Sequence, residues 1–330
     1  MSALIPIRQA IETARNPMYP AMEMLVLSHS SLGVFDSCER KMEFRQFFGT
    51  PLVKEDSYPG DVGNAIHRGF GEWLITEDED KAIMAYALKF PFAQEFSKPS
   101  NSQRSFEAGV STLLALTNHG FLRQHQIVKI NTLDKGVQYG VEVPFAFHIT
   151  GAPFPFPVYF VGFIDCVLYN HITGRFIVTD LKTTRMNMDD PTALYQYDQQ
   201  TIPYGVILEH LLNKPIREFE TAYLHCYIDL LEPKVRLLEY TKSEQDLLDW
   251  KLSLFNKIDR MAHSYKTGMF MRASHGTTCM SYNRACYFHD VCMHREHRVL
   301  QMIVGGEPRK ELFSTGEKPW VIAELPYERT

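Results

Sequence analysis

The stretch VGFIDCVLYNHITGRFIVTDLKTT, residues 161–184, decides the fold, because two apolar strand-like runs flank a short polar turn. If the turn is residues 171–174, a bulge-free antiparallel hairpin places Asp165 directly opposite Asp180. Side chains two residues apart on a strand share a face, so Lys182 projects beside Asp180. The hairpin therefore predicts two carboxylates and an ammonium group on one face.

Two carboxylates at that separation repel each other unless a cation lies between them. Oxygen ligands of this kind suit Mg²⁺ or Mn²⁺. Beside such a cation, Lys182 would orient a water molecule or stabilise a charged transition state. A solvated hairpin face with ordinary surface charges is the alternative. The charges interrupt strongly apolar strands, which favours a metal site.

The composition limits the classes of protein that the chain can be. Its 330 residues are 45% apolar and 12% aromatic, which excludes a disordered chain. The net charge of −5 excludes a globally basic coat for nucleic acid, so nucleic-acid contacts would need local basic patches. We find no signal-peptide pattern and no apolar run of membrane-spanning length, so we expect a cytoplasmic protein without membrane contact.

The order Asp165, then Asp180-x-Lys182, resembles the signature of the PD-(D/E)XK nuclease superfamily. Further elements resemble its RecB-like branch. A Gly-x-x-x-His element ending at His67 precedes the hairpin, and Glu142 lies on the preceding predicted strand.

A Gln-x-x-x-Tyr element, Gln200 to Tyr204, follows the hairpin, and its spacing predicts both residues on one face of a helix. Taken alone, it also fits an amphipathic helix with a core tyrosine, for which Gln196 is a competing polar partner. Likewise, a lone histidine such as His67 is by itself most simply a core or surface residue.

The resemblance implies a metal-dependent DNA nuclease with a restriction-endonuclease-like core. The implied metal ligands are His67, Asp165, Asp180 and the Leu181 carbonyl. The implied catalytic set is His67, Glu142, Asp165, Asp180, Lys182, Gln200 and Tyr204, with Glu142 as a supporting residue or third ligand.

We expect an α/β fold with a central mixed sheet, flanking helices, a helical insertion, and chain ends joined by a metal cluster. The expected divisions are a helical segment with Cys38 and His67 (1–74), the insertion (75–135), the nuclease core (136–242), and a C-terminal helix with the cysteine segment (243–330). Two helices are marked by their ends. One spans 27–49, with Ser30 or Ser31 as N-cap and Gly49 as its stop; the other spans 243–268, with a Ser243-x-x-Asp246 capping box and Gly268 as C-cap.

Six cysteines are too few for a disulfide framework, and their clustering indicates metal or redox chemistry. Cys166 and Cys226 lie in apolar strands and should be buried. One early and three late cysteines resemble the iron–sulfur subset of RecB-like nucleases, which includes the CRISPR-associated exonuclease family, the AddB nuclease domain and viral relatives.

That resemblance implies a [4Fe–4S] cluster on Cys38, Cys279, Cys286 and Cys292. The first late interval is Cys-x6-Cys, where those families have Cys-x2-Cys. Zn²⁺ held by cysteine with His275 or His289 is the alternative, and four unrelated free thiols are a second one.

Basic and aromatic residues near both groups of cysteines predict contacts with phosphates and unpaired bases. They are Arg40, Lys41, Phe44, Arg45, Phe47, Phe48, Arg284, Tyr287, His294, Arg295, His297 and Arg298. The sequence thus favours a nuclease, most simply an exonuclease acting on single-stranded DNA or DNA ends. An inactive DNA-end-binding or adaptor protein on the same fold and a zinc-stabilised interaction protein remain alternatives, and the oligomeric state stays open.

Overall fold

The computed structural model describes most of the chain, with gaps at both ends and in several loops. The described residues are 19, 21–48, 58–95, 104–120, 125–185, 190–196, 198–212, 218–273, 276–281, 284–286, 288–289, 292, 310–313 and 317–328.

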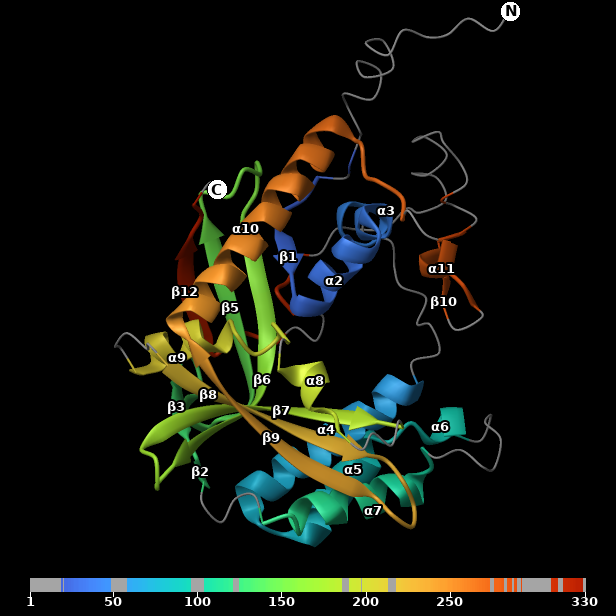
Figure 1. Ribbon diagram of the computed structural model, residues 1–330, viewed down its shortest axis with the longest axis vertical. Coiled ribbons are helices and arrows are strands. Elements are labelled where there is room, and N and C mark those ends of the chain that lie inside the picture. Colours follow the sequence, from blue (N-terminus) through green and yellow to red (C-terminus); the bar gives the residue numbers. More distant parts are fainter. Residues whose placement is uncertain are drawn as a thin grey trace, which may run out of the picture.

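One mixed sheet forms the centre of the described part of the chain (Figure 1), with the strand order β12-β5-β6-β7-β8-β9 and with β1 and β2 added to β6. Its strands are β1 (Leu25–Leu27), β2 (His125–Ile127), β5 (Val141–Thr150), β6 (Val158–Asn170), β7 (Arg175–Thr184), β8 (Glu218–Tyr227), β9 (Lys234–Ser243) and β12 (Val321–Pro326). Two small ladders pair β3 (Lys129–Thr132) with β4 (Gly136–Tyr139) and β10 (Met280–Ser281) with β11 (Arg284–Ala285).

The hairpin of β6 and β7 has the predicted register. Asn170 pairs with Arg175, and the antiparallel pairs continue to Cys166 and Thr179. The next position in this register places Asp165 across from Asp180. Because Asn170 accepts the backbone N–H groups of the turn, the local sequence fixes where the hairpin reverses.

One edge of β6 is shared by two strands that do not meet. β1 runs parallel to β6 as far as Phe160, and β7 pairs with the same edge only from Cys166 onward. Residues 161–165 are therefore paired with neither strand along this edge, which is where Asp165 lies.

The described helices lie on both faces of the sheet. They are α2 (His29–Ser37), α3 (Glu39–Met42), a π-helical turn (Glu43–Phe47), α4 (Tyr58–Thr76), α5 (Glu79–Lys89), α6 (Phe92–Glu95), α7 (Phe106–Thr117), α8 (Thr192–Tyr195), α9 (Tyr204–Leu212), α10 (Glu244–Thr267) and α11 (Gly276–Cys279).

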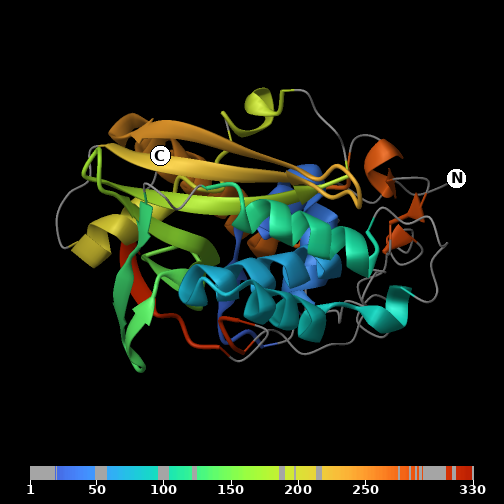
Figure 2. The same cartoon turned by 90° about the horizontal axis from the view of Figure 1, so that it is seen from below.

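Two apolar cores result from this layering. The larger core packs buried residues of α2, α9 and α10 against one face of the sheet, and the other packs α4, α5 and α7 against the opposite face. Figure 2 shows these last three helices, blue to green, gathered on one side of the strands. The α/β class with a central mixed sheet and flanking helices is thus confirmed.

The helix ends show where local signals succeed and where they mislead. The capping box of α10 is confirmed: Ser243 caps its N-terminus with Asp246, and Gly268 closes it in the left-handed conformation (φ 66°). The N-cap of α2 was predicted wrongly, because Ser28 occupies that position and Ser31 is its partner in the capping box. Gly49 lies outside the described residues.

Residues 75–135 were expected to form a helical insertion. The last helix in this segment ends at Thr117, and the strands β2 and β3 follow it. β2 joins the central sheet through β6. Among the described residues, no helix combines the length and apolar character needed to cross a membrane.

Candidate metal and active site

Helix α4 brings His67 to the sheet through a close contact at Gly63. A Cβ atom at Gly63 would lie 2.8 Å from Oγ1 of Thr183 on β7, which is too near for an ordinary contact. Glycine therefore lets the helix lie directly against the strand. His67 follows one turn later, on the side of α4 that faces the strands.

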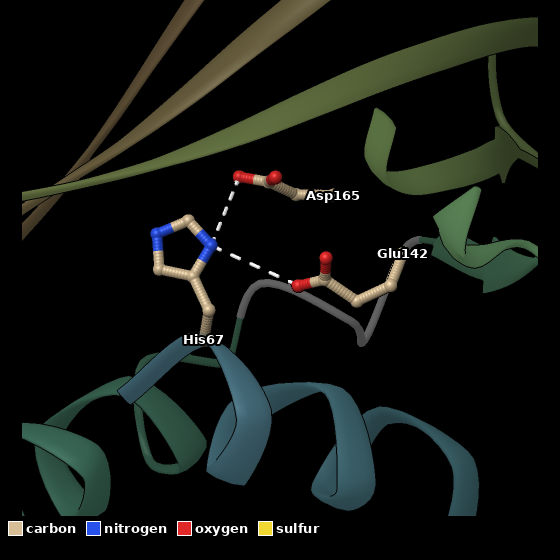
Figure 3. Close-up of side chains that lie close together, drawn as sticks. All are labelled: His67, Glu142 and Asp165. Carbon is tan, nitrogen blue, oxygen red and sulfur yellow. Dashed lines mark ion pairs between the residues drawn. The ribbon is translucent and has the colours of Figure 1, made fainter. Parts of the chain in front are cut away.

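His67 meets two carboxylates from neighbouring strands (Figure 3). Its Nδ1 atom lies 3.4 Å from Oδ2 of Asp165 on β6 and 3.8 Å from Oε1 of Glu142 on β5. One ligand atom from each of the three residues lies within 4.8 Å of the other two. This is a donor set of two oxygens and one nitrogen on three separate elements.

The regular geometry of β5 and β6 is interrupted at Glu142 and Asp165. Glu142 has a positive φ of 49°, an uncommon conformation for a residue other than glycine. Val141 and Val143 on either side of it pack into opposite cores, although alternation would place them on one face. The pairing of β5 with β6 is recorded on both sides of Glu142 and Asp165 but not between them. The strained backbone at Glu142 thus coincides with the interruption of the ladder at which its carboxylate and that of Asp165 approach His67.

Asp165 is held by the backbone of the neighbouring strand. Its Oδ2 atom accepts a hydrogen bond of 2.7 Å from the N–H of Leu181. Burial alone would raise the pKa of Asp165. The charge of His67 and the hydrogen bonds from His67 and the Leu181 backbone outweigh burial and lower that pKa. The Asp165 carboxylate is thus kept ionised.

The same charges favour a proton on His67. Burial opposes its charged form, but Asp165 and then Glu142 outweigh burial and raise the pKa of His67 to about 10. A histidine binds a metal through its neutral imidazole, so a cation bound at His67 would displace this proton.

Asp180 lies next to this cluster, and its side chain is only 3% exposed. Gln200 Nε2 donates a hydrogen bond of 2.9 Å to Oδ1 of Asp180. Oδ2 forms an ion pair of 2.8 Å with Nζ of Lys182, and no other group of the described residues donates a hydrogen bond to it. An ionised oxygen in this position is suited to a cation.

Burial and then the charge of Asp165 raise the pKa of Asp180 to about 7. Lys182 opposes this shift but does not cancel it. The two hairpin carboxylates therefore differ, because His67 stabilises the Asp165 anion, whereas burial and the charge of Asp165 favour a proton on Asp180.

Gln200 and Tyr204 do not share a helical face, so that prediction is wrong. Helix α9 begins at Tyr204, and Gln200 lies in the preceding loop. In this loop Gln200 joins Asp180 to Lys182, because its Oε1 atom also accepts a hydrogen bond of 2.6 Å from Lys182 Nζ. Tyr204 is buried, and its hydroxyl donates to the carbonyl of Phe163 on the unpaired edge of β6.

The donor set fits a divalent cation with a preference for oxygen ligands. Two ionisable carboxylates and an imidazole lie within reach of one point, and the Asp180 oxygen paired with Lys182 lies beside them. A cavity of about 390 Å³ opens onto Asp165, Asp180, Leu181 and Lys182.

Sequence reasoning missed two residues at this cavity. Arg104 comes from the segment before α7, and Asn64 lies on α4 between Gly63 and His67. Burial and then the charge of Arg185 lower the pKa of Arg104. Asn64 could have been predicted, because it lies within the Gly-x-x-x-His element, directly after Gly63. No local pattern connects Arg104 with the hairpin.

The cysteine region joins distant parts of the chain. Glu39, next to Cys38, pairs with Arg260 of α10 at 2.7 Å, and its carboxylate also accepts the N–H of Met271. Arg272 donates to the carbonyl of Cys292. The early cysteine therefore lies near the late ones, as expected.

The Cys-x6-Cys interval is closed by the small ladder of β10 and β11. Met280 pairs with Ala285, and the N–H of Cys286 donates a hydrogen bond of 2.6 Å to the carbonyl of Cys279. Burial is the main cause that raises the pKa of the Cys292 thiol. The nearby thiols of Cys38 and Cys279 add to this increase. Among the described residues, however, no three of these thiols lie within 4.8 Å of one another.

Three of the aromatic residues expected to stack on DNA are buried. Phe44 and Phe47 are fully buried and Phe48 is 2% exposed, so this prediction is wrong. Phe44 and Phe48 form a small core with Phe288, against which Cys286 and Cys292 pack. Tyr287, His294, Arg295, His297, Arg298 and His275 lie outside the described residues.

Comparison with known proteins gives one match to a family and several to structures. The model of the PD-(D/E)XK nuclease superfamily matches residues 26–293. A crystal structure described as a "putative exonuclease" from Eubacterium rectale has 12% identity and a TM-score of 0.47, covering 90% of this chain and 95% of that one. The structure of SSO0001 has 14% identity and a TM-score of 0.28, covering 70% of this chain and 84% of that one. No curated protein matches the chain.

Proposed function

The chain belongs to the PD-(D/E)XK nuclease superfamily, and from the geometry of its site we propose a metal-dependent DNA nuclease of the RecB-like branch. It would act as an exonuclease on single-stranded DNA or DNA ends. The observation that carries the proposal is the convergence of His67, Glu142 and Asp165 beside the Asp180–Lys182 pair. Each of these residues has a distinct task in phosphodiester hydrolysis.

His67, Asp165 and Asp180 would hold Mg²⁺ or Mn²⁺, with the Leu181 carbonyl as a further ligand and Glu142 as a third carboxylate. When bound, the cation polarises the scissile phosphate and lowers the pKa of a coordinated water. The ligands must release their protons first, and His67 and Asp180 are the groups whose pKa values are raised.

Lys182 and Gln200 would orient the reacting groups. Lys182 Nζ already lies 2.8 Å from Asp180 and 2.6 Å from Gln200, so its position is fixed before substrate binds. Its charge offsets the negative charge that develops when a water oxygen attacks phosphorus and the bond to the leaving nucleoside oxygen breaks. Tyr204 supports the unpaired strand edge, and Arg104 offers a guanidinium to a neighbouring phosphate.

We further propose a structural [4Fe–4S] cluster on Cys38, Cys279, Cys286 and Cys292. The β10–β11 ladder supports it, because it brings together the two cysteines whose spacing departs from the usual pattern. A tetrahedral zinc site would require thiolate sulfurs about 3.8 Å apart, given Zn–S bonds of ~2.3 Å.

The test is degradation of end-labelled single- and double-stranded DNA with Mg²⁺, Mn²⁺ or EDTA. Wild-type protein should cleave with either metal and not with EDTA. Asp180→Ala should abolish cleavage while the fold is retained, and Asp134→Ala, at an exposed turn, is the matched control. Undiminished cleavage by Asp180→Ala would reject the site, and DNA binding without any cleavage by the wild type would favour the inactive end-binding protein.

A further inference from the structure

A second cavity opens beside the carboxylates, on the side away from Lys182. Its volume is about 540 Å³, within the range of ~300–1,000 Å³ typical of small-molecule sites. It shares Asn64, Asp165 and Gln200 with the cavity that contains Lys182 and Arg104. A molecule bound at Asp165 can therefore extend in two directions.

The two cavities differ in chemistry. The first contains the lysine Lys182 and the arginine Arg104, whose charged groups suit phosphates. Among the described residues, no lysine or arginine lines the second, which we call the aromatic cavity. Its apolar lining has two parts. Phe163 and Leu312 are half-buried and pack with Val161 and Phe313, whereas Phe145 and Phe160 are almost fully buried in the larger core. An uncharged, flat group fits these walls better than a phosphate does.

The aromatic cavity follows from the unpaired edge of β6. Among the described residues, no strand lies beside residues 161–165 on this edge, and Phe163 is half-buried. The Phe163 ring lies 4.8 Å from that of Phe313, at an interplanar angle of 60°. Tyr204 donates a hydrogen bond of 3.0 Å to the Phe163 carbonyl, which fixes the backbone beneath the ring.

The rim of the aromatic cavity is polar and uncharged at several points. Ser28 and Ser30 at the start of α2 line it, together with Asn64 and Gln200. Helix α2 has no acidic residue in its own first turn. Such a rim can hydrogen-bond to the edge of a base or to a sugar, while the apolar walls contact its faces.

We infer that the aromatic cavity binds the base of an unpaired nucleotide next to the scissile phosphate. This inference rests on the proposed nuclease function and specifies its substrate. Bases in a duplex are stacked and paired, so a base can enter only from a single strand or a frayed end. Every base has an aromatic face, so the contact should tolerate any sequence.

The first test changes the substrate and leaves the protein intact. An end-labelled thymidine oligonucleotide carries one abasic residue, which is moved along the strand in successive substrates and digested by wild-type protein with Mn²⁺. Cleavage at one phosphate adjacent to the abasic residue should fall roughly 5- to 150-fold, corresponding to the loss of one stacked base. An unbroken, uniform ladder would overturn the inference.

The second test changes Phe163. In an Asp180→Asn background, Phe163→Ala should weaken binding of the intact oligonucleotide by roughly 5- to 150-fold, measured by fluorescence anisotropy, and Phe163→Tyr should restore it. Phe176→Ala is the matched control, because Phe176 is also half-buried on the same hairpin but lies outside the cavity. A Phe163→Ala protein that still discriminates against the abasic residue would contradict the assignment of the cavity.

The two proposals fail in different ways. Wild-type protein that cleaves no strand with Mg²⁺ or Mn²⁺ would overturn the nuclease and the inference with it. Wild-type protein that cleaves normally but ignores the abasic residue would overturn only the base-binding cavity.

Discussion

The carboxylate centre and the cysteine region are built from different kinds of element. Asp165 lies on a strand of 13 residues, Asp180 on one of 10 and His67 on a helix of 19. Of the late cysteines, Cys279 ends a helix of four residues and Cys286 follows a strand of two. Three ligand atoms converge within 4.8 Å in the first region but, among the described residues, not among the thiols of the second.

The difference shows what each region needs in order to form. Long elements packed in two apolar cores hold the carboxylates together even at the electrostatic cost of their proximity. Short elements cannot fix four thiols in the same way, so a bound cluster would have to supply the missing rigidity. Substitutions in each region should therefore leave the other region intact.

Removal of Lys182 should show that the carboxylate centre is assembled without it. Lys182→Met should lower kcat by roughly 100- to 1,000-fold, because the charge that stabilises the transition state is lost. Mn²⁺ should still bind, as measured by calorimetry, since the ligands lie on other residues. Loss of Mn²⁺ binding together with activity would mean that Lys182 holds the site together rather than serving the reaction.

Replacement of a cluster cysteine should disturb the other region and spare the carboxylates. Cys286→Ser should lose iron and sulfide and lower Tm by about 5–10 °C, because the cluster closes a long loop between the chain ends. Metal analysis and calorimetry measure both effects. Cys166→Ser, at a buried strand position, should keep the full metal content. Stoichiometric zinc without iron would instead establish the zinc alternative.

The pH dependence of stability should report the strain in the carboxylate centre. The folded state raises the pKa of Asp180 from 3.8 to about 7, so it binds this proton more tightly than the unfolded chain does. The resulting stability is full below about pH 4 and is lost as the pH rises through 7.

In metal-free protein, Asp180→Asn stays neutral and should avoid this loss. Its Tm should exceed that of wild type by about 5 °C above pH 7, and the advantage should vanish near pH 4. Thermal melts across this range measure the effect. An Asp180→Asn protein no more stable than wild type at pH 8 would show that the carboxylates are not electrostatically strained.

The smallest effect should come from the contact that positions Cys38. Glu39→Gln loses the ion pair with Arg260 but keeps an oxygen for the N–H of Met271, so Tm should fall by only about 1–3 °C. Iron loading should become slower, measured by absorbance during reconstitution. Asp36→Asn, which loses a pair with Lys257 on the same helix α10, is the control and should load normally.

The sequence by itself determined the features that depend on local geometry. The hairpin register follows from a short turn and from alternation along two strands, which placed Asp165 across from Asp180. The ends of α10 follow from its capping box and from Gly268.

Only the tertiary structure decided which distant residues meet. The loop position of Gln200, the arrival of Arg104 and the burial of Phe44 depend on packing between segments far apart in the chain. The aromatic cavity exists because β1 and β7 leave part of one edge of β6 unpaired. Periodicity and capping describe neighbours along the chain, whereas these contacts arise when two apolar cores close on a shared sheet and fix what lies between them.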